Sequence, residues 1–492
     1  MPNKTQLARL WPEPGPPLTT ESPVRWPGIS PESTAAVRDY LQKDFEQHHG
    51  FFNLVGAHNH TPFHLLVEWV LGGAPEHLTA IWDQHVALER PRFESPHPIT
   101  EETFFDHLGD EQYYRAYLYF FCDLVLRKPV HAVVEEWIFG TRVNFGSEKA
   151  ALREDGMVNR LLAGFLHPLI YVGFGLEFSL PGLVAEGLAH TAVHHNASST
   201  LVPRYLFDKP SVPRSIRSNS AGVHAFSILA RIQRDSRYNS LGDTFKFDNI
   251  HMKYGEDVQR YAAEWITNGD MNSKEIAEKM KELIFCNVVI YAMGGWNEQM
   301  GFRHAEFVLM HLVTSSITMQ SYMATLTSTT SKSALLRAYF ARSLAYWISR
   351  GRPLLRPRSF FTSPHPTSLP PPIPGPTPTP NTSSTFPKIS ALGNITPNPW
   401  LQIIQSALVH PDDHLAKFQR TLAYYGALYG GVKAGEFRGT ELEGGEYIDG
   451  TLFVRTAGWT MLRMGRVREG EKSEYWASDP NFSISFVSLT AP

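Results

Sequence analysis

The chain has little cysteine: Cys122 and Cys286 are the only two among 492 residues. Two thiols are too few for a disulfide framework or for a cysteine-rich zinc or iron–sulfur site. We therefore expect a reducing, cytoplasmic setting. Any metal in this protein must be bound by histidine, by carboxylate or by a less common ligand.

The sequence also lacks an excess of either charge and lacks long apolar runs. Its 45 Lys and Arg residues nearly balance 48 Asp and Glu residues, and we find no basic cluster that would follow a phosphate backbone. No stretch offers 18 uninterrupted apolar residues, and the proline-rich N-terminus lacks the apolar core of a signal peptide. We expect a globular protein without a nucleic-acid partner and without a membrane span.

Several catalytic motifs are missing. Gly173-Phe174-Gly175 comes nearest to a dinucleotide-binding fingerprint, but it lacks the third glycine and lies in a helical context. No flavin or nicotinamide site is therefore expected. The chain has no His-Glu-x-x-His motif, no phosphate-binding loop and no Gly-x-Ser-x-Gly elbow, which weakens the interpretations as a protease, a nucleotide hydrolase or an esterase.

Helical patterns dominate what is present, and alternating strand patterns are scarce. Ser30-Pro31-Glu32 and Asn272-Ser-Lys-Glu275 are typical of capped helix starts, and Tyr113–Leu126 is an aromatic, apolar run long enough for a buried helix. The sequence therefore predicts an all-α fold.

The predicted organisation is one large helical domain. Residues 1–30 are expected to form an extended N-terminal segment, and residues 31–492 the domain itself. A proline-rich stretch at about 360–397 can neither pack a core nor form a helix, so we expect an inserted surface loop there. The C-terminal tail is predicted to be irregular, with a short strand near 482–487.

Histidine is the residue type that most suggests chemistry, with 21 copies in the chain. Buried imidazoles are costly unless they are hydrogen-bonded or bound to a metal. His167 and His311 lie in apolar segments, so both should be buried and each needs a partner. His194 and His195 stand at the polar end of an expected helix, which is typical of a helix terminus or a surface.

His414 and Lys417 are three residues apart and share a helix face if their segment is helical. A desolvated, neutral lysine can add carbon dioxide to become a carbamate, which is a carboxylate-like oxygen ligand. A solvated Asp–Lys surface is the alternative interpretation. Sequence alone leaves both open.

Several ordered blocks resemble the questin oxidase-like family of fungal proteins, from about residue 44 to 465. The blocks are Gly56–Leu66 with its three histidines, Tyr117–Phe121, Gly164–Ile170, Gly175–Phe178, Ala185–Ala189, Leu309–Ser315, Arg350–Pro353 and Asp413–Leu422. One departure is Phe63, which stands where the family pattern has a second histidine beside His64.

The resemblance implies an oxygenase of fungal polyketide metabolism that uses O2 to open the central ring of an emodin- or questin-type anthraquinone. Such proteins are often described as Baeyer–Villiger oxidases. The implied partners are a small planar aromatic substrate and O2, and the oligomeric state stays open. Since the sequence has no flavin fingerprint, a histidine-rich Fe(II) site is the simplest way to activate oxygen.

On this basis we predict roles for individual residues. The predicted Fe(II) ligands are His58, His167, His311, His414 and Lys417, the last in carboxylated form. The predicted acid–base groups are His60 and His64, the residues that would orient ligand imidazoles are Glu177 and Glu186, and a flat substrate pocket would be lined by Tyr117, Phe121 and Trp459.

Two other functions fit the sequence. One is a monooxygenase that takes electrons from NADPH without a bound flavin or metal, with the histidines acting as bases. The other is a non-catalytic helical protein that binds aromatic pigments, whose histidines satisfy one another in the core.

Overall fold

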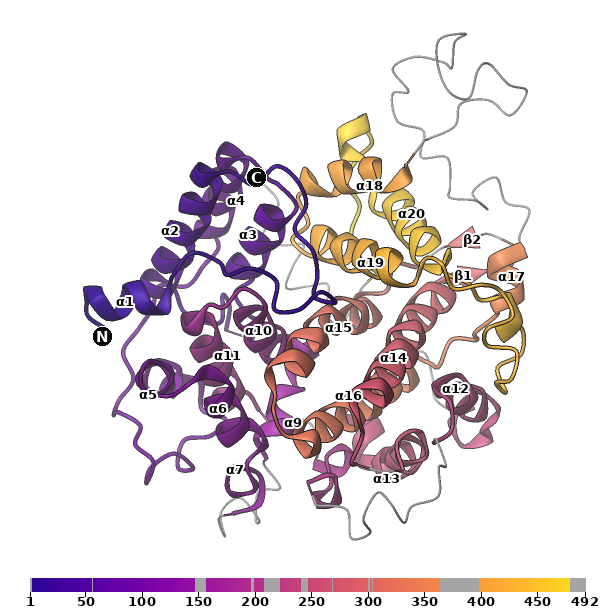
Figure 1. The fold of residues 1–492 in the computed structure, drawn as a ribbon, viewed down its shortest axis with the longest axis horizontal. Coiled ribbons are helices and arrows are strands. Elements are labelled where there is room, and N and C mark those ends of the chain that lie inside the picture. The colour runs from indigo at the N-terminus through magenta and orange to yellow at the C-terminus, as the bar shows by residue number, and fades with distance from the viewer. Residues whose placement is uncertain are drawn as a thin grey trace. The chain divides into compact units, whose positions relative to one another are not determined.

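The structure, a computed structural model, describes residues 2–54, 56–146, 156–195, 199–207, 222–239, 247–267, 269–299, 301–302, 304–362 and 398–477. The prediction of an all-α fold is confirmed (Figure 1). Within these residues the strands are confined to one short antiparallel pair, β1 (Trp296–Asn297) and β2 (Gly301–Phe302).

The chain divides into two compact units. The first comprises residues 1–285 and 315–351, and the second comprises residues 286–314 and 352–492. The boundaries fall inside two long helices, α14 (Ser273–Gly294) and α15 (Phe307–Thr325). Each of these helices therefore contributes residues to both units.

The first unit contains most of the helices. They are α1 (Lys4–Leu10), α2 (Pro31–Gln47), α3 (Thr61–Val70), α4 (Pro75–Val86), α5 (Tyr114–Arg127), α6 (Val130–Val134), α7 (Thr141–Phe145), α9 (Met157–Leu161), α10 (His167–Glu177), α11 (Pro181–Val193), α12 (Ala225–Arg234), α13 (Phe247–Trp265) and α16 (Thr329–Ser349). Ser30 caps α2 as expected: its side chain accepts from the backbone of Ser33, and Pro31 occupies the first turn.

In its described residues, the second unit adds four further helices. They are α17 (Pro357–Thr362), α18 (Pro399–Leu408), α19 (Leu415–Tyr429) and α20 (Leu452–Met464). Asn398 caps α18 by accepting from Trp400 N. The predicted inserted loop lies largely outside the described residues, as does the predicted strand at 482–487. The predicted extended segment at 1–30 includes the helix α1.

Glycines let α10 and α11 approach closely, and the two helices run side by side in Figure 1. A Cβ on Gly187 would lie 2.5 Å from Val172 N, and a Cβ on Gly175 would lie 2.6 Å from Val184 N. Both distances are shorter than atoms tolerate, so each helix needs a glycine where the other crosses it. Gly175, part of the incomplete dinucleotide motif, therefore serves helix packing.

None of the helices in the described part of the chain combines the length and the apolar character needed to cross a bilayer.

The α10–α11 contact yields a stability prediction. We expect Gly187→Ala to destabilise the protein by about 1–3 kcal/mol, because the added methyl group overpacks a backbone contact. Gly431→Ala is the matched control, since nothing lies within 4 Å of a Cβ at Gly431. Urea unfolding midpoints of both variants measure the effect. Equal midpoints would refute the close-packing argument.

Candidate active site

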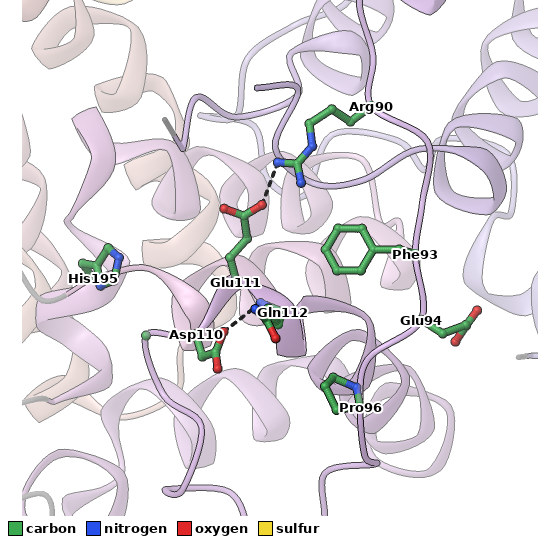
Figure 2. Close-up of a pocket in the computed structure, with 9 residues that line it drawn as sticks. Arg90, Phe93, Glu94, Pro96, Asp110, Glu111, Gln112 and His195 are labelled. Atoms are coloured by element: carbon green, nitrogen blue, oxygen red, sulfur yellow. Dashed lines mark hydrogen bonds and ion pairs between the residues drawn. The ribbon is translucent and has the colours of Figure 1, made fainter. Parts of the chain in front are cut away.

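A cavity of about 660 Å³ lies in the first unit (Figure 2). Its lining includes Arg90, Phe93, Glu111 and His195. Arg90 donates to Glu111 across 2.7 Å. The ring of Phe93 stacks on His49, with centroids 4.5 Å apart and planes 10° from parallel. Although His49 is beside this cavity, it is only 2% exposed.

Four imidazoles of the first unit form a stack. The ring centroids of His194 and His58 are 5.2 Å apart, those of His58 and His167 are 4.7 Å apart, and those of His167 and His60 are 4.8 Å apart. The interplanar angles are 8°, 10° and 20° in the same order. Two predicted ligands, His58 and His167, and one predicted acid–base group, His60, are thus neighbours.

The turn before His167 is strained. Gly164, Phe165 and Leu166 all have positive φ, at 51°, 53° and 69°, which is costly for the two non-glycine residues. A Cβ on Gly164 would collide with His194 and come within 2.7 Å of His58 Cε1. The turn therefore brings the backbone against the imidazole stack and starts α10 at His167.

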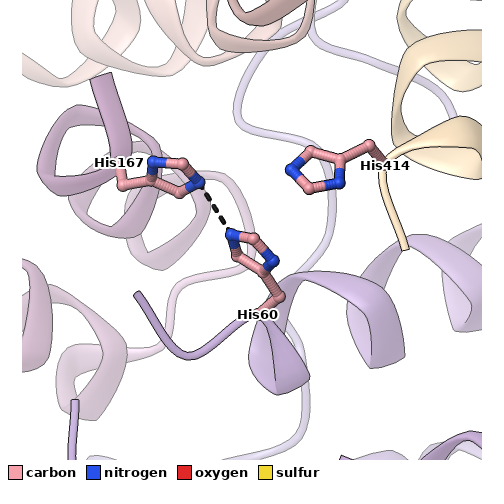
Figure 3. Close-up of side chains that lie close together, drawn as sticks. All are labelled: His60, His167 and His414. Atoms are coloured by element: carbon pink, nitrogen blue, oxygen red, sulfur yellow. Dashed lines mark hydrogen bonds between the residues drawn. The ribbon is translucent and has the colours of Figure 1, made fainter. Parts of the chain in front are cut away.

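Hydrogen bonds orient the His167 ring. Its Nδ1 lies 2.6 Å from Gly164 O, so Nδ1 carries the proton and Nε2 has the lone pair. That Nε2 lies 2.8 Å from His60 Nε2 (Figure 3), and His60 is therefore the donor between them. His60 comes just before α3, as the residue that precedes its first turn.

His190 and Glu186 on α11 complete the buried polar group. His190 is 0% exposed, and neither ring nitrogen has a hydrogen-bond partner among the described residues. The centroid of its ring lies 4.9 Å from that of His58 and 4.3 Å from that of Tyr171. Burial lowers the pKa of His190 well below its ordinary value and raises that of Glu186 well above. His190 is therefore neutral near pH 7, and burial favours the protonated form of Glu186.

His64 belongs to different contacts. Its Nδ1 lies 3.0 Å from His85 Nε2, and its Nε2 lies 3.5 Å from a carboxylate oxygen of Glu68. The second oxygen of Glu68 lies 3.0 Å from His77 Nε2. Although His60 and His64 are four residues apart, their rings therefore have different partners.

The second unit holds the other predicted ligands. His311 is fully buried on α15, and its Nδ1 lies 2.7 Å from Phe307 O. The His414 Nδ1 lies 2.6 Å from a carboxylate oxygen of Asp413. Their ring centroids are 5.1 Å apart at 71°. In both rings Nδ1 is the donor, so Nε2 presents the lone pair, as metal-binding histidines do.

The side chain of Asp412 holds the turn that precedes α19. One of its oxygens accepts from the backbone N–H groups of His414 and Leu415 at 3.0 Å and from Trp476 Nε1 at 2.9 Å. It therefore caps α19 and ties the segment to the chain near Trp476. Asp412, Asp413 and His414 each offer a ligand atom within 4.8 Å of the other two, an arrangement that can hold a metal ion.

Lys417, in the first turn of α19, is only 2% exposed. Burial lowers its pKa to about 8, although Asp413 and Asp412 oppose the shift. A lysine with this pKa is roughly one-tenth neutral at pH 7, compared with about one part in three thousand for an ordinary lysine. The solvated Asp–Lys surface that the sequence also allowed is therefore wrong for Lys417.

The predicted substrate residues are mostly packed. Tyr117 and Phe121 are 0% exposed and contact Phe104, to whose carbonyl oxygen Tyr117 donates. Trp459 is 9% exposed and contacts Trp296. None of these three lines the cavity beside His49. Of the residues predicted to orient imidazoles, Glu186 lies one turn from His190 on α11, and Glu177 is buried at the end of α10.

Sequence reasoning missed His190 and His49 as parts of this site. The prediction of a helix terminus at His194 agrees with its position directly after α11, but its stacking on His58 was not foreseen. The signal that was available is the spacing of Glu186, His190 and His194, which repeats every four residues along one helix face.

Comparison with known proteins gives a consistent result. The sequence profile described as questin oxidase-like matches residues 57–422. The chain is similar to a Baeyer-Villiger oxidase of Pestalotiopsis fici, with 28% identity over 58% of this chain and 62% of that protein. It is also similar to a questin oxidase of Aspergillus fumigatus, with 27% identity over 57% of this chain and 62% of that protein.

A third similar protein is an oxidoreductase of Aspergillus parasiticus, with 33% identity over 32% of this chain and 31% of that protein. The first two matches span about three fifths of the length of each relative.

His49 yields a pH prediction. Burial, with help from the charge of Arg90, lowers its pKa from 6.5 to about 4. Between these values the unfolded chain binds more protons than the folded one, so His49 makes the protein less stable as the pH falls from 6.5 to 4. The contribution is at most about 3 kcal/mol.

His49→Asn removes this titration and retains an oxygen that can accept from Phe51 N, as His49 Nδ1 does. We expect the urea midpoint of the variant to fall less steeply than that of the wild type over this pH range. His131→Asn, at an exposed position, is the control and should follow the wild type. Parallel curves for all three proteins would contradict the assignment.

Proposed function

Because the chain belongs to the questin oxidase-like family, we propose that it is an oxidoreductase that uses O2 to open the central ring of an emodin- or questin-type anthraquinone. The names of its relatives, a questin oxidase and a Baeyer-Villiger oxidase from fungi, support this class of reaction. The same names support a place in fungal secondary metabolism.

The proposed cofactor is a mononuclear Fe(II). The observation that carries this part is the orientation of the predicted ligands: His167, His311 and His414 each bind an oxygen acceptor through Nδ1. His311 and His414 therefore present Nε2 as the lone-pair nitrogen, in a tautomer that can bind iron. The Nε2 of His167 already accepts from His60 and would exchange that hydrogen bond for iron. The role of His58, for which stacking is the described contact, stays a prediction from the sequence.

Lys417 fits the proposed oxygen ligand. A carbamate forms only on a neutral amine, and the lowered pKa of Lys417 supplies one near neutral pH. Asp413 is a candidate that the sequence did not single out. Its carboxylate orients His414 in the carboxylate–histidine arrangement that is common around metals.

Iron bound to these residues would supply the one-electron chemistry that O2 needs in order to react with a closed-shell aromatic compound. The protein's own contribution is to hold the proposed ligands neutral, to keep water away from them and to place a proton donor nearby. His60 fits the last role, because its Nε2 donates to His167 within the stack.

A second candidate function is a Baeyer–Villiger monooxygenase that takes electrons from NADPH and needs no metal. The names of several relatives favour this reaction type. In that case the buried histidines act as bases, and the lowered pKa of about 4 keeps His194 in the neutral form that can accept a proton. Metal content separates the two candidates.

His311→Ala tests the iron site. We expect the variant to lose nearly all bound iron and to lower O2 uptake with emodin to below a tenth of the wild-type rate, because a neutral Nε2 ligand is removed. Elemental analysis of the purified protein and an oxygen electrode measure both quantities, with the exposed His131→Ala as control. A metal-free wild type that still consumes O2 would instead favour the NADPH reaction.

Lys417 is tested by two variants. Lys417→Ala should lower iron occupancy and O2 uptake at least tenfold, and a short carboxylic acid such as acetate should partly restore both by entering the vacated space. Lys417→Met, of similar size, should lower both but should not be rescued. Full activity in Lys417→Met would remove the lysine from the proposed ligand set.

A further inference from the structure

A second cavity, of about 460 Å³, adjoins the one beside His49, and both are lined by Glu94 and Pro96. We call the pair the 90–123 groove, after the span of chain that supplies all its lining except His195. Each cavity falls within the range of roughly 300–1,000 Å³ that is typical of sites for small organic ligands.

The groove has a rigid aromatic wall. His49 N donates to Arg90 O and Arg92 N donates to Gln47 O, both at 2.9 Å, so this segment pairs with the end of α2. Phe93 follows directly and rests one face on His49, yet it remains 36% exposed. An aromatic ring fixed in this way, with one side open, is a platform on which a flat ligand can stack.

The remaining apolar lining continues along the groove. It consists of Pro96, Pro98, Ile99, Ala116, Tyr119 and Phe120. Tyr119 and Phe120 on α5 are half-buried, whereas the predicted substrate residues Tyr117 and Phe121 on the same helix are fully buried. Flat walls of proline and aromatic rings suit a planar polycyclic ligand better than a flexible one.

The charged residues that line the groove determine which charge a ligand can carry. Its lining carries four carboxylates, Glu94, Asp110, Glu111 and Asp123, and a single guanidinium, Arg90. Arg90 is already paired with Glu111, and Asp123 is paired with Arg127 outside the lining. An anion would be repelled here, whereas hydroxyl groups can donate hydrogen bonds to the carboxylates of Glu94 and Asp110.

We propose that the 90–123 groove binds a neutral, hydroxyl-bearing planar aromatic molecule. His195 lines the groove, and the preceding residue, His194, stacks on His58. The groove thus lies next to the buried imidazoles of the same unit and serves as the place where the substrate is first held. Its identification as a substrate site rests on the proposed function, but binding itself does not.

The test measures the equilibrium affinity of the purified protein for two matched tricyclic probes. Equilibrium dialysis with detection by absorbance gives both affinities without turnover. Neutral 1,8-dihydroxyanthraquinone should bind at least tenfold more tightly than anthraquinone-2-sulfonate at pH 6. Equal or tighter binding of the sulfonate would overturn the proposed ligand class, and no binding of either probe would overturn the site.

Two variants locate the site. Phe93→Ala removes the platform, and Gln112→Trp places a large ring at an exposed lining position without touching the core. Both should weaken binding of the dihydroxy probe at least tenfold. Tyr475→Ala, an exposed aromatic at 55% exposure outside both cavities, is the control. Unchanged affinity in Gln112→Trp would overturn the location even if Phe93→Ala failed to fold.

A charge variant and a rate measurement complete the test. Glu94→Gln should tighten binding of the sulfonate probe at least threefold, whereas Glu278→Gln, an exposed carboxylate elsewhere, should not. If the wild type consumes O2, Gln112→Trp should raise KM for emodin with little change in kcat. If the protein shows no O2 uptake but still binds the probes in this pattern, the proposed function is refuted, whereas the proposal that the groove binds such a ligand stands.

Discussion

Burial of basic side chains is the constraint on which the rest of this structure depends. His190 and His311 are fully buried, and Lys417 is nearly so. A charged imidazolium or ammonium group is costly away from water, so burial shifts the pKa of such a group toward its neutral form. Neutral nitrogen is also the form that binds metals and accepts protons. One physical cause therefore prepares both the histidines and the lysine for chemistry.

Neutrality alone leaves open which ring nitrogen carries the lone pair, and the structure resolves this through local contacts. Backbone oxygens of Gly164 and Phe307 accept from His167 and His311, and the carboxylate of Asp413 accepts from His414. Each acceptor lies within four residues of the ring that it orients. Orientation is thus determined by short-range structure, namely the strained turn before α10, the helical repeat of α15 and the start of α19.

Residue patterns could predict the helical class, the burial of His167 and His311, and the shared segment of His414 and Lys417, because these depend on local apolar context and helix spacing. The division into two units, the stack of His194 on His58, and the hydrogen bond from Trp476 to Asp412 depend on contacts between distant segments. Phe93 shows the limit clearly. Nothing near it in the sequence indicates that His49, 44 positions earlier, would support its ring.

The glycines of the first unit connect stability to the site. Gly187 and Gly175 let the backbones of α10 and α11 approach closely, while Gly164 lets the turn before α10 lie against His194 and His58. A side chain at any of these positions would separate the helices that carry His167, His190 and His194. The imidazole stack therefore depends on the absence of a side chain at Gly164, Gly175 and Gly187. This accounts for glycine motifs in a sequence that has no dinucleotide fingerprint.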